Sequence, residues 1–253
     1  MGESRLPASP PRAHVLLVHG FAEHRRRYDV LAGELAGAGF AVHRFDLRGH
    51  GESGGRRGHV ERFADYRGDL ERVAAAVLPA SAGDGPPAVL LGHSLGGLVA
   101  LDAVLARPGR FRGLALSSPF LAPAFRLPPF VRAFAGAAAR LAPDAEFEAG
   151  IDPEGLSRDP EVVRRYREDP LVLHRLTAAW LRAVLDAQAR VLERAGDVRL
   201  PLLLLLGEAD PIADPARGRE LFERLGSPEK RLEVYPGYRH EVFNEVGRER
   251  VVA

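Results

Sequence analysis

The sequence of 253 residues contains no cysteine, which excludes disulfide bonds, thiol catalysis and cysteine-ligated metals. Neither sign of charge is in excess, because 35 basic residues face 34 acidic ones, and this balance argues against a charge-based nucleic-acid-binding role. No apolar run is long enough to cross a bilayer. The N-terminus is polar and proline-rich and does not resemble a signal peptide, so we expect a cytoplasmic location.

Short apolar runs alternate with helical patterns along most of the chain. The first run, HVLLV at 14–18, is continuously apolar, as is typical of a strand buried in a parallel sheet. The alternation predicts an α/β fold with a mostly parallel, doubly wound sheet and an active site at the carboxyl ends of its strands. The predicted strands are 14–18, 40–45, 88–91, 114–116, 202–206 and 232–235, and the predicted helices between them are 27–38, 60–78, 94–107 and 215–225.

A glycine-flanked serine joins one of these strands to the helix that follows, in the stretch Gly-His-Ser-Leu-Gly at 92–96. A strand, a sharp turn and a helix are the context that the G-x-S-x-G nucleophile elbow requires. Glycines two residues before and after Ser94 remove Cβ atoms that would collide with the neighbouring strand and helix. The pattern predicts Ser94 as a nucleophile, and the N–H of Leu95 in the first helical turn as a donor to a developing oxyanion.

A serine nucleophile needs a base and an orienting acid, which follow it in this fold in the order acid, histidine. Asp210 lies just past the strand 202–206, where the acid is expected. Glu208 and Asp214 are rivals, but Glu208 directly follows a glycine and Asp214 is typical of a helix start. His240 is the one histidine that follows the acid in the chain. The order therefore predicts Ser94, Asp210 and His240 as a catalytic triad.

Other polar residues near predicted strand ends have mainly structural interpretations. The loop at 19–22 closes the first strand and is expected to supply a second oxyanion donor, the N–H of Phe21. A histidine beside a buried strand end, such as His19, is more often a structural hydrogen-bonding group. Asp46, Arg48 and His50 are interpreted in the same way, and the arginines at 25–27 as a solvated helix start.

Nothing in the sequence predicts a metal or another cofactor. The histidines form no tight H-x-x-x-H pair, and the glycine-rich stretch at 49–58 lacks the G-K-S/T of a phosphate cradle. We therefore expect no cofactor.

The strand–helix alternation breaks once, between residues 119 and 200. This predicts two parts, a core formed by residues 1–119 and 200–253, and a helical lid inserted at 120–199. Amphipathic helices are expected at 160–167 and 173–195. The alternative is a small packed helical subdomain with no part in binding.

Five segments resemble, in the right order, the monoacylglycerol lipase and lysophospholipase branch of the serine α/β-hydrolases: HGFAEHRRRY, FDLRGHGES, LLGHSLGGLVAL, LGEADPIADP and YPGYRHEVFNE. The resemblance extends from about residue 14 to residue 248 and includes the lid segment GLSRDPEVVRRYREDPLV. It implies the α/β-hydrolase fold, with the lid inserted after the sixth strand of the family. It also implies the triad and oxyanion donors predicted above, and a lid over an acyl pocket. From the apolar composition of residues 120–143 we predict Phe120, Phe130 and Phe134 as substrate-binding residues that line the acyl channel.

The chain departs from the family pattern at both ends. About a dozen residues precede the first parallel strand, where the family has an antiparallel pair, and the chain stops about where the last helix of the family would begin. A sheet edge without a flanking hairpin exposes backbone donors and apolar surface. On this basis we expect marginal stability or self-association.

The leading functional hypothesis is a serine ester hydrolase that acts on monoacylglycerol or lysophospholipid-like lipids through an acyl-enzyme. A carboxylesterase or thioesterase for smaller acyl compounds is an alternative, a peptidase is another, and a hydrolase-like protein that binds without turnover is a third. Residues 120–143 are rich in apolar side chains and contain three arginines but no acid. This composition predicts transient contact between the lid and a membrane surface.

Overall fold

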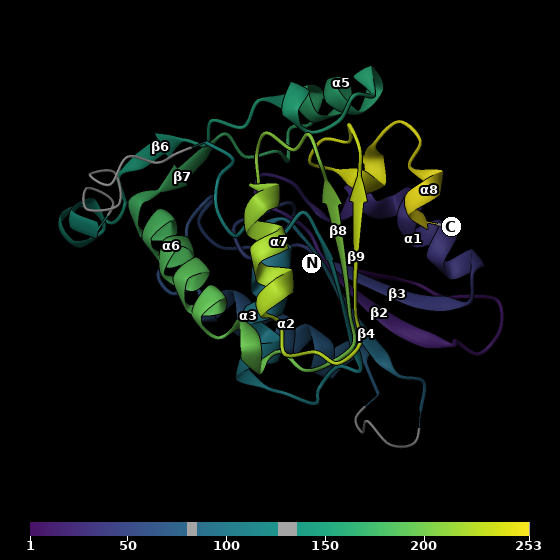
Figure 1. The fold of residues 1–253 in the computed structure, drawn as a ribbon. Coiled ribbons are helices and arrows are strands. Elements are labelled where there is room, and N and C mark those ends of the chain that lie inside the picture. Colours follow the sequence, from purple (N-terminus) through teal and green to yellow (C-terminus); the bar gives the residue numbers. More distant parts are fainter. Residues whose placement is uncertain (80–84, 126–135, 253) are drawn as a thin grey trace.

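The computed structural model describes residues 1–79, 85–125 and 136–252. Within them one sheet is formed by β1 (Gly2–Arg5), β2 (Ala13–Val18), β3 (Phe40–Phe45), β4 (Ala88–His93), β5 (Gly113–Ser117), β8 (Leu202–Gly207) and β9 (Lys230–Tyr235). Their spatial order is β1-β3-β2-β4-β5-β8-β9 (Figure 1). Only the β1–β3 pair is antiparallel.

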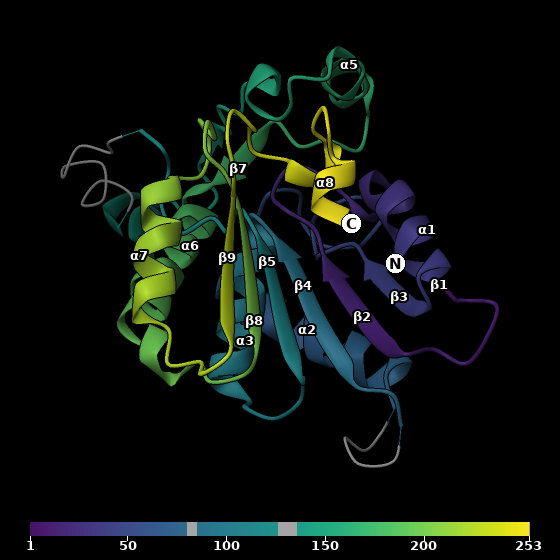
Figure 2. The ribbon, with the colours of Figure 1, turned by 45° about the vertical axis from the view of Figure 1, so that its right-hand side comes forward.

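Helices cover both faces of the sheet (Figure 2). One face packs its apolar side chains against α2 (Ala64–Val77), α3 (Leu95–Ala106), α6 (Ala178–Glu193) and α7 (Pro215–Arg224). The other face packs against α1 (Asp29–Gly37), the short helix η4 (Val242–Asn244) and α8 (Glu249–Val252). Helix α3 is buried all round, so it lies in the interior of the first layer. This is the doubly wound α/β architecture that the sequence predicts.

The six predicted strands are confirmed, with bounds that differ by a few residues at most. The expectation of an unprotected sheet edge at the N-terminal side was wrong, because β1 pairs with β3 along its whole length. All four residues of β1 are exposed. The sequence of β1, GESR, has no apolar alternation that would predict a strand, and its pairing with β3 makes it one.

The segment between β5 and β8 interrupts the alternation of strands and helices. It contains β6 (Glu146–Glu148), η2 (Pro153–Gly155), α5 (Pro160–Glu168), β7 (Arg175–Thr177), α6 and η3 (Ala195–Asp197). Figure 1 shows α5 and the antiparallel β6–β7 pair beyond the carboxyl ends of β8 and β9. These elements therefore lie over the end of the sheet where the site is expected.

The boundary of one predicted helix in this segment was wrong. A continuous helix over 173–195 was expected, but residues 175–177 form β7 and α6 begins at Ala178. The Thr177 side chain accepts a hydrogen bond from the Trp180 N–H and so caps the helix at this point. Within the described ranges, no helix is long and apolar enough to cross a membrane.

Candidate active site

Ser94 occupies the sharp turn between β4 and α3. Its φ of 51° lies in the left-handed region that residues other than glycine seldom adopt. A Cβ atom on Gly96 would lie 2.1 Å from the carbonyl oxygen of Val18, and one on Gly92 would lie 2.4 Å from that of Gly96. The turn is therefore compatible only with glycine at both flanking positions.

His240 and Asp210 form a buried hydrogen-bonded pair at the carboxyl ends of β9 and β8. The Nδ1 atom of His240 lies 2.7 Å from Oδ2 of Asp210. The other carboxylate oxygen accepts hydrogen bonds from the N–H groups of Ile212 (2.8 Å) and Ala213 (3.0 Å), which fixes its orientation. Ser94 and His240 line the same cavity. The three residues predicted as a triad are thus brought together at one place.

The two rival carboxylates have other surroundings. Glu208 is exposed to solvent. Asp214 caps α7 by accepting a hydrogen bond of 2.9 Å from the N–H of Ala216. Asp210 is therefore the carboxylate that contacts the imidazole.

The surroundings of His240 raise its basicity. Burial alone would lower the pKa of this imidazole, but the charge and hydrogen bond of Asp210, helped by Glu241 and Glu23, raise it above its ordinary value. The ring of His93 packs 4.7 Å from that of His240, centroid to centroid. Burial and the neighbouring His240 hold the pKa of His93 well below its ordinary value. One imidazole is thus poised to take a proton while the other stays neutral.

The peptide that carries the N–H of Leu95 is held from its carbonyl side. The carbonyl oxygen of Ser94 accepts hydrogen bonds from the N–H groups of Phe120 (3.0 Å) and Gly97 (3.0 Å). Because the C=O and N–H of a trans peptide point in opposite directions, these bonds also set the direction of the Leu95 N–H. Among the described residues, no group accepts a hydrogen bond from that N–H.

The peptide that carries the N–H of Phe21 is held in the same manner. The carbonyl oxygen of Gly20 lies 2.7 Å from Nδ1 of His19, and Nε2 of His19 accepts a hydrogen bond from the N–H of Leu47. His19 therefore donates from Nδ1 and acts structurally, as the sequence predicts. The Phe21 N–H has no acceptor in the part of the chain that the structure describes. Both predicted oxyanion donors are thus oriented, and neither is bonded to an acceptor within residues 1–79, 85–125 and 136–252.

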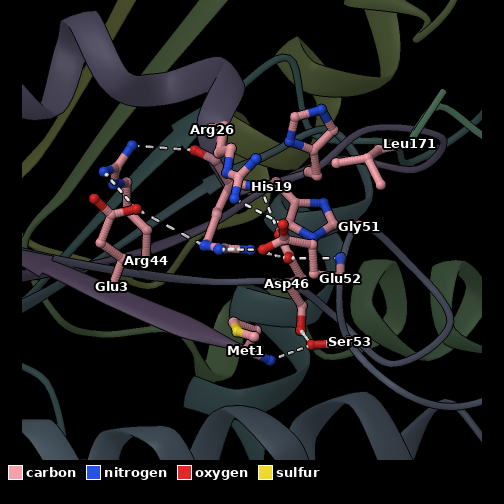
Figure 3. Close-up of polar contacts among 12 residues, drawn as sticks. Met1, Glu3, His19, Arg26, Arg44, Asp46, Gly51, Glu52, Ser53 and Leu171 are labelled. Carbon is pink, nitrogen blue, oxygen red and sulfur yellow. Dashed lines mark hydrogen bonds and ion pairs between the residues drawn. The ribbon is translucent and has the colours of Figure 1, made fainter. Parts of the chain in front are cut away.

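Asp46, at the end of β3, ties together the loops behind the oxyanion donors (Figure 3). One carboxylate oxygen accepts from the Arg25 N–H at 2.8 Å, and the other contacts the Arg25 guanidinium and accepts from the Glu52 N–H at 3.0 Å. Arg57 donates to the carbonyl oxygens of Gly51 (2.8 Å) and Leu171 (2.9 Å). The glycine-rich loop is thereby joined both to the core and to the segment between β5 and β8.

The interpretation of residues 25–27 as a solvated helix start was wrong for two of the three arginines. Arg25 is buried against Asp46 and Glu52, and only Arg26 is largely exposed. The third, Arg27, is buried because its Nη2 donates to both carboxylate oxygens of Glu241, at 2.6 and 2.7 Å. A run of like charges had suggested solvent exposure, but two of its members are neutralised by distant carboxylates.

A second carboxylate faces Arg27 beside His240. Oε2 of Glu23 lies 3.3 Å from Nε of Arg27, and Oε1 of Glu23 accepts hydrogen bonds from the Tyr28 hydroxyl and from the N–H of Gly20. Burial and the charge of Glu241 raise the pKa of Glu23. The cluster is thus rich in acceptors and has more carboxyl groups than guanidinium groups.

A cavity of about 280 Å³ lies beside Ser94. Its lining has a polar part, formed by the oxyanion loop, the elbow and the His240 loop, and a larger apolar part, to which α6 contributes most. Phe120 lies in the apolar part, whereas Phe130 and Phe134 fall outside the described residues. The main apolar lining residues are Phe120, Leu176, Trp180, Leu181, Val184 and Ile212.

The family model described as serine aminopeptidase, S33, a hydrolase family, matches residues 9–247. The chain belongs to this family. Across the same residue ranges that the structure describes, no group of three His, Cys, Asp or Glu side chains could hold a metal ion.

Relatives of the chain within the family include monoacylglycerol lipases. The monoacylglycerol lipase of Mycolicibacterium smegmatis is 37% identical over 242 residues, covering 94% of this chain and 85% of that protein. Human monoglyceride lipase is 32% identical over 245 residues, covering 95% and 79%. The crystal structure of Paleococcus ferrophilus monoacylglycerol lipase superposes with a TM-score of 0.90 at 35% identity, over 100% of this chain and 96% of that one. The fold is thus the α/β-hydrolase fold and the protein is a serine hydrolase.

Several residues at the site escaped the sequence analysis. Glu23, Arg27 and Glu241 form an ionic cluster that joins distant parts of the chain, and no local pattern signals it. Gln188 is different, because it is a polar residue on the apolar face of α6, at positions i+4 and i+8 from Val184 and Trp180. Such an interruption of an apolar stripe was visible in the sequence and marked a residue with a specific partner.

Proposed function

We propose that this S33 hydrolase cleaves the acyl ester of monoacylglycerol through an acyl-enzyme, with Ser94 as nucleophile, His240 as general base and Asp210 as the group that orients the imidazole. The observation that carries the proposal is that Ser94 and His240 open onto a cavity whose larger part is apolar. An apolar wall of this kind suits an acyl chain, since each buried methylene contributes about 0.8 kcal/mol. The resemblance to monoacylglycerol lipases supports the same substrate class.

In the proposed reaction His240 takes the hydroxyl proton as Ser94 attacks the ester carbonyl carbon. The N–H groups of Phe21 and Leu95 stabilise the resulting oxyanion. His240 then returns the proton to the leaving alcohol, and an acyl ester on Ser94 remains. Water repeats the sequence and releases the fatty acid. Asp210 accepts from Nδ1 throughout, which leaves Nε2 of His240 free for proton transfer.

The polar part of the cavity favours a neutral alcohol as the leaving group. Glu23 and Glu241 both line it, and Arg27, which contacts both, supplies one positive charge. Because the pKa of Glu23 is raised to about 7, that carboxyl group is only partly ionised at neutral pH, and the three residues carry no net positive charge that would attract a phosphate group. Carboxylates accept hydrogen bonds from glycerol hydroxyls and repel a phosphate group. This charge pattern supports monoacylglycerol over a lysophospholipid with a phosphate headgroup, the other substrate class of the leading hypothesis.

We also propose that residues 120–199 act as a lid on the core formed by 1–119 and 200–253. The large exposed side chains of Phe125 and Leu141 support a transient contact between this segment and a membrane surface. Self-association through the sheet edge is a further prediction, supported by the position of β9 at the end of the strand order. The cytoplasmic location remains a prediction from the sequence.

A substrate panel on the purified protein tests the proposed function. We expect hydrolysis of a monoacylglycerol with a long acyl chain at least about tenfold above that of the matching lysophosphatidic acid, as a transition-state difference of 1.4 kcal/mol would give. A short nitrophenyl ester and an amino-acid anilide serve as esterase and peptidase arms, and Ser94→Ala is the control in each. The lipase assignment would be contradicted if the protein hydrolysed the anilide alone or the short ester alone.

A further inference from the structure

One face of α6 forms much of the apolar cavity wall. Leu181, Val184 and Leu185 lie on it, between Trp180 at one end and Gln188 at the other. These two end residues differ from the three between them, because each is linked to a predicted oxyanion donor. Trp180 contacts Phe21 directly, whereas Gln188 contacts Phe120, which is bonded to the peptide that carries the Leu95 N–H. The helix that forms the wall for the acyl chain is therefore connected to both donors.

Gln188 is a buried amide in an otherwise apolar surface, with 3% of its area exposed. Its Nε2 donates a hydrogen bond of 3.0 Å to the carbonyl oxygen of Phe120. Its Oε1 is buried and has no partner among the described residues. An unpaired buried acceptor is unfavourable, and an apolar side chain would avoid it. Packing therefore does not explain the amide, whereas its bond to Phe120 does.

The Phe120 bond continues to the nucleophile. The N–H of Phe120 donates to the carbonyl oxygen of Ser94, at 3.0 Å, and this carbonyl belongs to the same peptide as the N–H of Leu95. Phe120 is thus held on its carbonyl side by Gln188 and holds the Ser94–Leu95 peptide with its N–H. A shift of α6 relative to the elbow would disturb both bonds.

The other end of the wall reaches the second donor. The indole ring of Trp180 packs on the ring of Phe21, with centroids 4.2 Å apart. The indole is itself fixed, because its Nε1 donates to the Tyr66 hydroxyl at 3.1 Å. The Phe21 ring also makes a T-shaped contact with the ring of His50, at 5.4 Å between centroids. The residue whose N–H is the second donor therefore contacts both α6 and the core.

We propose that Gln188 and Trp180 are positioning residues through which α6 holds the two oxyanion donors in place. The inference rests on the proposed function, since it assumes that Phe21 and Leu95 form the oxyanion hole. Its consequence is that the acyl wall and the oxyanion hole move as one unit. Loss of either contact lowers the rate of the chemical step even for a substrate too short to touch the wall.

The first test replaces Gln188 by methionine, which has a similar length and no donor. On nitrophenyl acetate we expect kcat to fall about tenfold or more, as for a weakened oxyanion hole, with KM changed less than about twofold. The inhibition constant of a short alkylboronic acid, whose tetrahedral adduct mimics the transition state, should rise by the same factor. Arg182→Ala, on the exposed face of the same helix and paired with Asp186, is the matched control and should change neither value.

The second test compares two variants of Trp180. Trp180→Phe keeps a ring against Phe21 and should retain kcat within about threefold, whereas Trp180→Leu removes the ring contact and should lose about tenfold. Active sites are titrated with a fluorophosphonate, so kcat refers to folded enzyme only.

Three outcomes decide the matter. A Gln188→Met protein with a lower melting temperature but an unchanged kcat and boronate affinity would overturn the proposal, and so would an effect confined to KM for long acyl chains. If the wild-type protein hydrolyses nitrophenyl acetate but not monoacylglycerol, the proposed function is contradicted. The kinetics of the variants on nitrophenyl acetate still test the positioning residues in that case.

Discussion

Asp210 and Asp214 carry the same carboxyl group four residues apart, and their partners distinguish them. Asp210 is buried and contacts His240, whereas the carboxylate of Asp214 accepts the N–H of Ala216 at the start of α7. A carboxylate against an imidazole selects its tautomer and stabilises the imidazolium, while a carboxylate at a helix start stabilises that helix alone. The role of each aspartate therefore depends on the group that its carboxylate contacts.

Substitutions at these positions should separate the two roles. Ser94→Ala should lower kcat by about 10⁴ to 10⁶, and Asp210→Asn by roughly 10³ to 10⁴ because the amide favours the wrong tautomer. Asp214→Asn is the matched control and should cost less than about threefold, since asparagine is an equally good cap. Steady-state kinetics on one ester measure all three. A larger loss for Asp214→Asn than for Asp210→Asn, with both proteins folded, would show that the acid is misassigned.

The charge around His240 also predicts a pH dependence. The pKa of His240 is raised mainly because Asp210, and then Glu241, offset the effect of burial. The neutral imidazole is the active base, so kcat/KM should fall as the pH drops through a value above 6.5, the ordinary histidine pKa. Glu241→Gln removes a negative charge and should move this acid limb to lower pH, whereas the exposed control Glu229→Gln should not. An acid limb that is identical in the two variants would refute this account.

Among the elements, α6 combines a structural and a binding surface on one helix. Its buried side chains pack on α3 and the sheet, and a neighbouring stripe faces the cavity. Arg190 also pairs with the buried Asp102 of α3, which Arg67 of α2 contacts from the other side. The helix is therefore anchored along its length, and its cavity face has a defined position.

Truncation on that face should discriminate by acyl length. Leu181→Ala removes methyl groups that an acyl chain would contact, so kcat/KM on a monoacylglycerol of twelve to eighteen carbons should fall by roughly tenfold, equivalent to 1.4 kcal/mol. Hydrolysis of an ester with two to four acyl carbons should stay within a few fold. Leu192→Ala, half-buried on the same helix but outside the cavity lining, is the matched control. Equal losses on both substrates would mean that the wall has no role in acyl binding.

For the whole molecule, buried neutral histidines should set the response to acid. Burial lowers the pKa of His19 to about 4 and that of His50 to about 3, and it holds the pKa of His93 well below its ordinary value. In the unfolded chain these groups titrate near 6.5. Below that pH the unfolded state binds more protons than the folded state, so the free energy of unfolding decreases on acidification. Well above pH 6.5 these histidines are neutral in both states, and the free energy of unfolding does not depend on pH through them.

The expected slope is about 1 kcal/mol of unfolding free energy per pH unit for each such histidine between pH 6 and 5, because each takes up most of one proton on unfolding. His240 acts in the opposite sense, because its pKa is raised in the folded state. Denaturant unfolding at a series of pH values measures the slope, which should decrease in His50→Gln and stay the same in His174→Gln, an exposed control. An unfolding free energy that is constant from pH 6.5 to 5 would contradict this prediction.

The sequence by itself determined the parallel strands, the turn at Ser94 and the candidates for acid and base, because these depend on local patterns: apolar runs, flanking glycines and chain order. The tertiary structure decided what depends on partners far along the chain. The strand β1 exists through its pairing with β3, and Arg27 is buried because Glu241, 214 residues away, neutralises it. Gln188 has a specific contact because folding places α6 beside Phe120. Such contacts follow from the packing of whole elements, which no local pattern encodes.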